Sequence, residues 1–409
     1  MVNPVAGEKP PERRTLAAGL AATWIVQVMG TMAVFGVPVL APVIAPEMGI
    51  DPTLVGVYVA ICYLTAQVTG LMSGGFIDRF GALRLSQASC LLAALGIVAL
   101  FPALVWLAPL AAVLMGCCYG PLNPTSSKIL RGLGGARHQP LIFSVKQTGV
   151  PVAGVLVGAL LPVLTVEFGW RVAFGTFAVL AVVVAIALQP IRETFDADRD
   201  RAGGRPRIEI MGPLRLVLRD RALRGMSLVG FALAGSQICV SSFYVLYLTQ
   251  VQGWSLVDAG MIYAVVQGGG IAGRLVWGSV ASHLFRPAWV LGGLSLIVAL
   301  LFALVAAMTP AWPLPAVVVL SAVLGLCSFG WNGVWLSEVS DLAPEDQLGA
   351  AMGGAQFVMF GGVTVLPPLF GTLVDVTGSY IGPFAGTAAF VVLMAGYMAA
   401  TRRRRDGNV

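Results

Sequence analysis

Residues 74–84 read GGFIDRFGALR and separate two long apolar segments of the chain. The segments on either side, residues 53–76 and 84–105, are each long enough to cross about 30 Å of hydrocarbon as one helix. In a bilayer every backbone N–H and C=O group needs an internal partner, which favours helical spans. The charged pair Asp78 and Arg79 is therefore expected at the membrane surface, in a short loop between two spanning helices.

Ten more apolar segments follow the same pattern. Hydrophobic residues make up 57% of the 409 residues and charged residues only 11%, whereas soluble globular chains carry about 25% charge. The sequence therefore predicts an all-α membrane protein with twelve transmembrane helices. The predicted spans are 17–44, 53–76, 84–105, 108–130, 140–165, 170–190, 225–250, 256–281, 288–308, 314–338, 348–372 and 380–401.

The sequence lacks the residue clusters that enzymes need. Its six cysteines lie in apolar segments without metal-ligand spacing, and its two histidines are far apart. No zinc-protease, nucleophile-elbow or phosphate-loop motif is found. We therefore expect no catalytic residues, no metal site and no cofactor, and we do not expect an enzyme.

The distribution of charge decides what the net charge of +6 means. With the N-terminus inside, 22 of the 25 lysines and arginines fall on the cytoplasmic side. This positive-inside bias predicts a multi-pass protein of the cell inner (plasma) membrane with both termini in the cytoplasm. The basic run at 402–405 is then expected to contact the anionic inner leaflet, and no nucleic-acid partner is expected.

The stretch at 74–84 also carries a resemblance to a known family. Its Gly-x-x-x-Asp-Arg-x-Gly pattern is similar to the signature loop of the major facilitator superfamily, between the second and third helices. The resemblance implies two pseudo-symmetric six-helix bundles, and a loop whose acidic and basic residues hold the inward-closed state. This sequence departs from the family at Ala82 and Leu83, where basic residues are usual. The residues expected to form this conformational gate are Gly74, Asp78, Arg79, Gly81 and Arg84.

A charged segment divides the chain into two halves. Residues 191–224 contain nine arginines, in contrast to the apolar segments before and after them. We expect an N-terminal six-helix bundle at 1–190, a cytoplasmic linker at 191–224 and a C-terminal six-helix bundle at 225–409. The linker is expected to include a short amphipathic helix on the membrane surface.

Internal repetition relates the two halves. A shift of 204 residues places Gly260 on Gly56 and Gly278 on Gly74, whereas Arg274 falls on Gly70. Polar residues near the midplane repeat as well, as a transport site between two bundles requires. The alternative is that these amides only form helix–helix hydrogen bonds. The repeated pairs are Gln27 with Gln237, Asn123 with Asn332, and Gln147 with Gln356.

Two cations lie inside spans, and each occurs in one half only. Arg274 lies about 12 Å from the inner end of its span at 1.5 Å per residue, and Lys146 lies at a comparable depth. Because no Asp or Glu lies mid-span, this pair favours an anionic substrate, which arginine can bind through two parallel hydrogen bonds. The alternatives are that Lys146 reaches the inner surface and that Arg274 only pins helix ends. The predicted substrate-binding residues are Arg274, Lys146, Gln27, Asn123, Gln147, Gln237, Tyr244, Asn332 and Gln356.

The position of the arginine adds a second resemblance. An arginine in the eighth span is similar to the monocarboxylate and oxalate–formate exchanger branches of the superfamily, where it binds the substrate carboxylate. Monocarboxylate porters usually carry an acidic residue one turn earlier, where this sequence has Gly270. The difference favours exchange or facilitated diffusion over proton symport. A more distant resemblance is to cyanate- and nitrate-type anion porters.

The sequence thus predicts a secondary active or facilitative transporter of a small organic anion, of monocarboxylate or dicarboxylate type, that works by alternating access. The expected partners are this anion, a counter-anion or a proton, and the lipid bilayer, and the protein is expected to be a monomer. The alternative functions are an exporter of neutral or cationic amphipathic compounds, an inorganic-anion porter, and a non-transporting receptor.

Overall fold

The computed structural model describes residues 13–131, 133, 139–197, 211–344 and 347–406. In this part of the chain the secondary structure is helical and contains no strand. Twelve helical stretches are long and apolar enough to cross a membrane. The predicted spans are confirmed, since each of them overlaps one of these twelve stretches.

The first half forms six spans from nine helices, because two spans are broken and one carries a short extension. The helices are α1 (Arg13–Glu47), α2 (Val55–Phe80), α3 (Ala82–Ala99), α4 (Ala108–Tyr119), α5 (Leu122–Leu130), α6 (Gln139–Gln147), α7 (Gly149–Phe168), α8 (Trp170–Ala187) and α9 (Arg192–Phe195).

The second half repeats this plan after the linker. Its helices are α10 (Met211–Arg219), α11 (Arg221–Gln250), α12 (Leu256–His283), α13 (Pro287–Ala306), α14 (Leu314–Ser328), α15 (Asn332–Leu342), α16 (Leu348–Thr377) and α17 (Ile381–Asp406). The α10 helix is the short amphipathic helix expected in the linker, and it packs against α16. The segment between 198 and 210, which holds the rest of the predicted linker, lies outside the described residues.

Local sequence signals place several helix ends. Asp220 and Ser255 cap α11 and α12, because their side chains accept backbone N–H groups of the first turn. Gly81 and Gly169 each form the single-residue turn between two helices and have φ angles of +97° and +82°. A residue with a side chain rarely adopts this backbone conformation, so glycine allows the chain to reverse within one residue.

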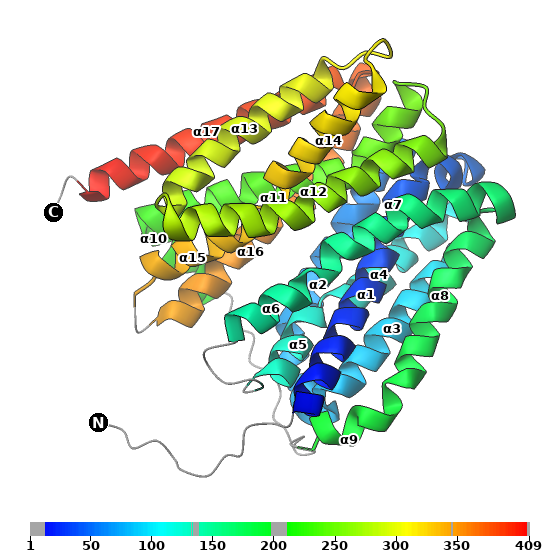
Figure 1. The fold of residues 1–409 in the computed structure, drawn as a ribbon, viewed down its shortest axis with the longest axis horizontal. Helices are drawn as coiled ribbons and strands as arrows, with labels where there is room; N and C mark the ends of the chain where they lie inside the picture. The colour runs from blue at the N-terminus through cyan, green and yellow to red at the C-terminus, as the bar shows by residue number, and fades with distance from the viewer. Residues whose placement is uncertain (1–12, 132, 134–138, 198–210, 345–346, 407–409) are drawn as a thin grey trace.

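The two halves form separate bundles that meet at one end (Figure 1). Helices α7 and α12 cross there, as do α2 and α16, and small residues bring their backbones together. A Cβ added to Gly260 would lie 2.5 Å from the carbonyl oxygen of Gly158, and one added to Gly56 would lie 2.3 Å from that of Pro367. At the other end, which carries the linker, a Cβ added to Gly74 or Gly278 would meet no atom within 4 Å.

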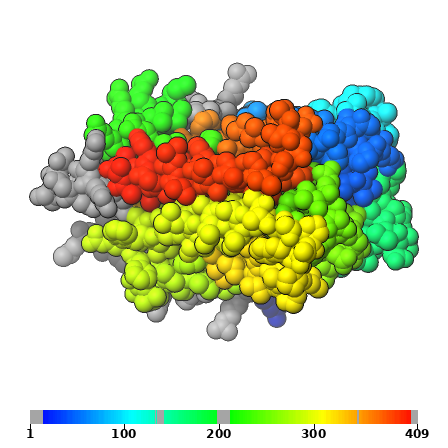
Figure 2. All heavy atoms as spheres, turned by 90° about the horizontal axis from the view of Figure 1, so that it is seen from above, coloured from blue at the N-terminus to red at the C-terminus, as the bar shows by residue number. Residues whose placement is uncertain are grey.

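The outer surface of the second bundle suits contact with lipid. Helices α13 and α17 lie side by side on the face seen in Figure 2, and helices of the first bundle emerge beyond one end of them. Large apolar side chains on this pair point outward, among them Trp289, Leu300 and Leu393, which are 72%, 61% and 64% exposed. An apolar area of this kind in a soluble protein would cause aggregation, whereas a bilayer covers it.

Candidate functional site

Breaks in the spans place the polar residues of the centre. The fourth span is interrupted between α4 and α5, where Gly120-Pro121 precedes Asn123. The tenth span is interrupted between α14 and α15, immediately before Asn332. Broken helices occur within membranes where the chain is buried in protein or lines a polar cavity. The two asparagines thus occupy equivalent positions at the start of a second half-helix.

Lys146 lies at the centre of a cluster of amide groups in the first bundle. Its ammonium group donates to Oε1 of Gln27 at 2.7 Å, to Oδ1 of Asn123 at 2.7 Å and to Oε1 of Gln147 at 3.3 Å. These three acceptors match the three N–H groups of a lysine ammonium. The Lys146 side chain is 1% exposed, so it does not extend to the inner surface, and this alternative is wrong.

Gln27 connects the cluster to α1. Its amide nitrogen donates to Oγ1 of Thr31 at 3.1 Å while its oxygen accepts from Lys146. Gln27 is 2% exposed, and Asn123 is exposed. The lysine ammonium group therefore lies between the buried amide of Gln27 and the exposed amide of Asn123.

Arg274 reaches across from the second bundle to the first. Its Nη1 atom donates to the backbone carbonyl oxygen of Gln147 at 2.8 Å, and its Nε atom is buried without a hydrogen-bond partner among the described residues. Lys146 and Arg274 thus contact the same residue, because the Lys146 ammonium group donates to the side chain of Gln147 at 3.3 Å. Neither residue forms an ion pair within the part of the chain that the structure describes.

The second bundle contains a neutral counterpart of the lysine cluster. Gln237 on α11 accepts hydrogen bonds from Nε1 of Trp331 at 3.1 Å and from Nδ2 of Asn332 at 3.3 Å. In the first bundle Gln27 and Asn123 both accept from the Lys146 ammonium group, whereas in the second bundle Asn332 donates directly to Gln237. A direct hydrogen bond between the repeated amides, as in the alternative interpretation, occurs in the second half, where Asn332 is half-buried.

Two of the predicted residues lie apart from these clusters. Tyr244 is 0% exposed and its hydroxyl group lies 2.8 Å from Oγ of Ser321 inside the second bundle, where its ring stacks on Tyr247. Gln356 on α16 is exposed and forms no hydrogen bond to another described residue. The structure thus gathers Gln27, Asn123, Lys146, Gln147 and Arg274 in one place, and Gln237 with Asn332 in another.

Two polar residues, one beside Arg274 and one on the same helix, were not predicted. Tyr119 at the end of α4 lies near both Thr31 and Arg274, and its ring packs edge-on against Tyr63. Gln267 lies two turns before Arg274 on α12, is 0% exposed and donates to the hydroxyl of Tyr263 at 2.6 Å. Tyr119 directly precedes the Gly-Pro break of its span, a signal available in the sequence.

The predicted gate differs from the expected loop. Helix α2 continues through Asp78 and Arg79 to Phe80, and α3 begins at Ala82, so Gly81 is the only residue between them. The expectation of a short loop is therefore wrong, since a glycine with a positive φ angle reverses the chain in one step. Asp78 forms no hydrogen bond or ion pair with any described residue in this conformation, in which the ends of α2 and α12 near the linker lie apart.

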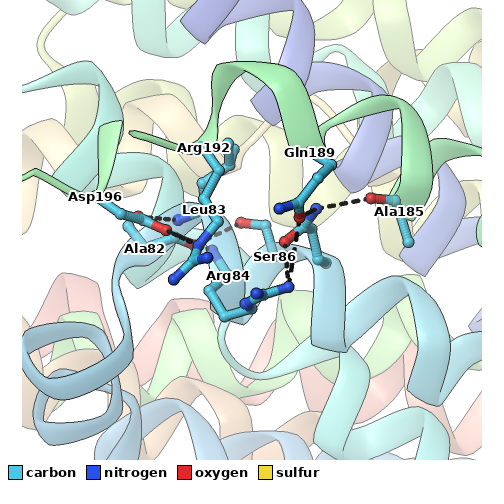
Figure 3. A network of polar contacts seen from close by, with 9 residues as sticks. Ala82, Leu83, Arg84, Ser86, Ala185, Gln189, Arg192 and Asp196 are labelled. Atoms are coloured by element: carbon cyan, nitrogen blue, oxygen red, sulfur yellow. Dashed lines mark hydrogen bonds and ion pairs between the residues drawn. The ribbon is translucent and has the colours of Figure 1, made fainter. Parts of the chain in front are cut away.

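Asp196, at the end of the sixth span, binds the turn that follows α2 (Figure 3). Its carboxylate accepts from the backbone N–H groups of Leu83 at 2.8 Å and Arg84 at 3.0 Å, and it pairs with Arg192 at 3.5 Å. A Cβ at Gly81 would lie 2.1 Å from the Asp196 side chain, so only glycine fits there.

Arg84 belongs to a second part of this network. Its guanidinium group contacts the side-chain oxygens of Gln87 at 3.2 Å and Gln189 at 3.5 Å, and Gln87 donates to the backbone of Ala185. Arg84 therefore joins α3 to the end of the sixth span within the first bundle. Its proposed role in the gate, like that of Gly74, stays a prediction.

Comparison with known proteins agrees with this architecture. The family description "Major Facilitator Superfamily" matches residues 23–340, which is most of the chain. The chain belongs to this superfamily. Members of the Major Facilitator Superfamily are membrane transporters, so this chain is a multi-pass membrane transporter and not an enzyme.

Several curated transporters are similar over nearly the whole chain. The probable galactarate/D-glucarate transporter GudP of Escherichia coli K12 is 23% identical over 388 residues, which cover 86% of each chain. The hexuronate transporter of Bacillus subtilis 168 is 22% identical over 383 residues, covering 87% of this chain and 88% of its own. The fosmidomycin resistance protein of Escherichia coli K12 is 28% identical over only 42% of this chain and 45% of its own.

Solved structures share the fold at low identity. A bacterial homologue of the human lysosomal transporter Spinster, in an inward-facing and occupied conformation, has a TM-score of 0.72 at 15% identity, and the match covers 97% of this chain and 98% of that one. A point mutant of the nucleoside transporter NupG has a TM-score of 0.77 at 14% identity, with 94% of this chain and 99% of that one covered. The twelve spans are thus arranged as two six-helix bundles of the Major Facilitator type.

Proposed function

We propose that this transporter carries a small organic anion, and that Lys146 and Arg274 bind its negative charge. The observation that supports this most strongly is the meeting of two cations from opposite bundles, neither of which has an ion-pair partner in the described part of the chain. A buried positive charge without a counter-ion is costly, and an anionic ligand removes that cost.

The substrate class that we favour is a sugar acid, a chain of hydroxyl groups with one or two carboxylates. The similarity to galactarate/D-glucarate and hexuronate transporters supports this class. The amides of Asn123, Gln147 and Asn332 are at least partly accessible, and each offers both a donor and an acceptor for a substrate hydroxyl. Arg274 contributes the contact to a carboxylate.

A transport cycle is proposed from a site that lies between the bundles. In this structure the bundles touch at the end opposite the linker, and a rocking motion that closes the linker end would expose the site to the other side. The positive-inside distribution supports a cytoplasmic linker and cytoplasmic termini in the inner membrane, and this conformation then faces the cytoplasm. Closure of that end would bring Asp78 and Arg79 towards the second bundle, as their proposed gating role requires. We further propose that the monomer is the transporting unit.

The contacts of Gly270 bear on whether transport is coupled to a proton or to a second anion. A Cβ at this position would lie 2.9 Å from Phe329, so the structure leaves no room for the acidic residue that proton-coupled monocarboxylate porters have one turn before the arginine. We therefore favour exchange against a second anion over proton symport. Flux of labelled substrate that is accelerated by the same anion on the far side would support exchange, whereas an exporter of cationic compounds would show no such acceleration.

The test of the site is uptake of D-glucarate and D-galacturonate into proteoliposomes. Arg274→Ala is expected to lower uptake at least tenfold, since a lost hydrogen bond to a charged group costs about 1.5–3 kcal/mol. Arg171→Ala is the control, because Arg171 pairs with Glu47 at the opposite end of the bundle and leaves the site unchanged. Normal uptake by Arg274→Ala, at equal amounts of inserted protein, would remove Arg274 from the site.

A further inference from the structure

The hydrogen bond from Arg274 to the Gln147 carbonyl lies next to a proline. In a continuous α-helix the N–H group of residue 151 would donate to the carbonyl oxygen of Gln147. Pro151 has no N–H group, and its ring crowds the carbonyl four residues earlier. The helix is interrupted accordingly, since α6 ends at Gln147 and α7 begins at Gly149. The carbonyl that lacks its helical donor is the one that accepts from Nη1 of Arg274 at 2.8 Å.

This bond leaves one edge of the guanidinium group available. Arginine binds a carboxylate through two parallel N–H groups, either from both terminal nitrogens or from Nε and one terminal nitrogen. With Nη1 of Arg274 donating to Gln147, the edge formed by Nε and Nη2 remains. Nε is buried and has no partner among the described residues, although a buried N–H group normally has one. This N–H group without a partner indicates that an acceptor from a ligand binds at this edge of the guanidinium group.

We propose that Pro151 is a positioning residue of the anion site. By withholding an N–H group from the Gln147 carbonyl, Pro151 leaves that oxygen to orient Arg274, so that the Nε and Nη2 edge receives a substrate carboxylate side-on. The Lys146 ammonium group, which donates to the side chain of the same Gln147, adds a second positive charge beside this site. This proposal rests on the proposed function and adds to it the geometry of carboxylate binding.

A backbone substitution separates the missing N–H group from the shape of the proline ring. Pro151→Ala restores an N–H group that competes with Arg274 for the Gln147 carbonyl, whereas lactic acid at position 151 has the shape of alanine but an ester oxygen in place of the N–H group. We expect Pro151→Ala to raise the KM for D-glucarate about tenfold with little change in kcat, and the lactic-acid variant to keep the KM of the parent protein. Binding of D-glucarate, followed by thermal shift, should change in the same way.

The outcomes separate the effect of the missing N–H group from the effect of the proline ring. An equal loss of affinity in the alanine and lactic-acid variants would assign the effect to the ring and overturn the proposal, as would an unchanged KM in Pro151→Ala. If the parent protein binds neither D-glucarate nor D-galacturonate, the proposed function fails.

If Pro151→Ala does not insert, the α-hydroxy analogue of threonine at position 148 serves instead, since it turns the Gln147 carbonyl into a weaker ester acceptor. That variant is expected to raise KM, and an unchanged KM would overturn the proposal.

Discussion

A single methyl group at Gly260 should shift the balance between the two transport conformations. An alanine Cβ there would lie 2.5 Å from the carbonyl oxygen of Gly158 and 2.5 Å from Cγ of Pro162, across the contact between α12 and α7. Ordinary contact needs about 3.4 Å, so the bundles must separate by about 0.9 Å at this point. Crowding of this size typically costs about 1–3 kcal/mol. Because each 1.4 kcal/mol is a factor of ten, the observed conformation should lose about five- to 150-fold in population.

The measurement is the distance between the bundles at the end opposite the linker. Spin labels at Phe168 and Val376, which are 64% and 76% exposed, report on this end from α7 and α16. Gly260→Ala is expected to add a population with a longer distance. Gly278→Ala lies on the same helix with no atom within 4 Å of the added Cβ, and it should leave the distribution unchanged. If Gly260→Ala and Gly278→Ala give the same distribution as the parent protein, the contact does not control the equilibrium.

Two further perturbations test other parts of the structure. Lys146→Met should fold with nearly unchanged thermal stability, because removing a buried charge offsets the loss of its hydrogen bonds. It should nevertheless weaken binding of the dianion D-glucarate more than that of the monoanion D-galacturonate, and calorimetric titration that finds equal losses would contradict a role in binding the second charge. Asp196→Ala should lower the midpoint of thermal unfolding by removing the acceptor of two N–H groups at the start of α3, a loss of about 1–2 kcal/mol. Asp220→Ala, which removes the cap of α11, provides the scale for this effect.

The spans could be predicted from the sequence because each depends on a local property. An apolar stretch of about 20 residues has few alternatives to a transmembrane helix. The internal repeat is equally local, and its glycine pairs have a clear structural meaning. Gly56 and Gly260 lie at the contact between the bundles, whereas Gly74 and Gly278 lie in open space at the other end.

The partners of the polar residues could only partly be predicted. The depth of Lys146 in its span was readable, but the choice between the surface and the interior depended on Gln27 and Asn123, which come from other helices. Asp196 was missed because its role depends on tertiary contact with α3, more than 100 residues earlier in the chain. Tyr244 was included because its amphipathic ring could line a pocket, yet its hydroxyl group contacts Ser321 on α14 inside the second bundle.

The split of the two cations between the bundles has a consequence for the energetics of transport. The site that we propose carries two positive charges when it is empty, and each bundle contributes one of them. A doubly charged sugar acid would make the loaded site electrically neutral, whereas a singly charged one would leave one charge uncompensated. An uncompensated charge that crosses a membrane potential of 100 mV gains or loses about 2.3 kcal/mol. With a doubly charged substrate, the membrane voltage would then act far more on the conformational change of the empty carrier than on that of the loaded carrier. The voltage would therefore favour transport cycles in which the site stays occupied.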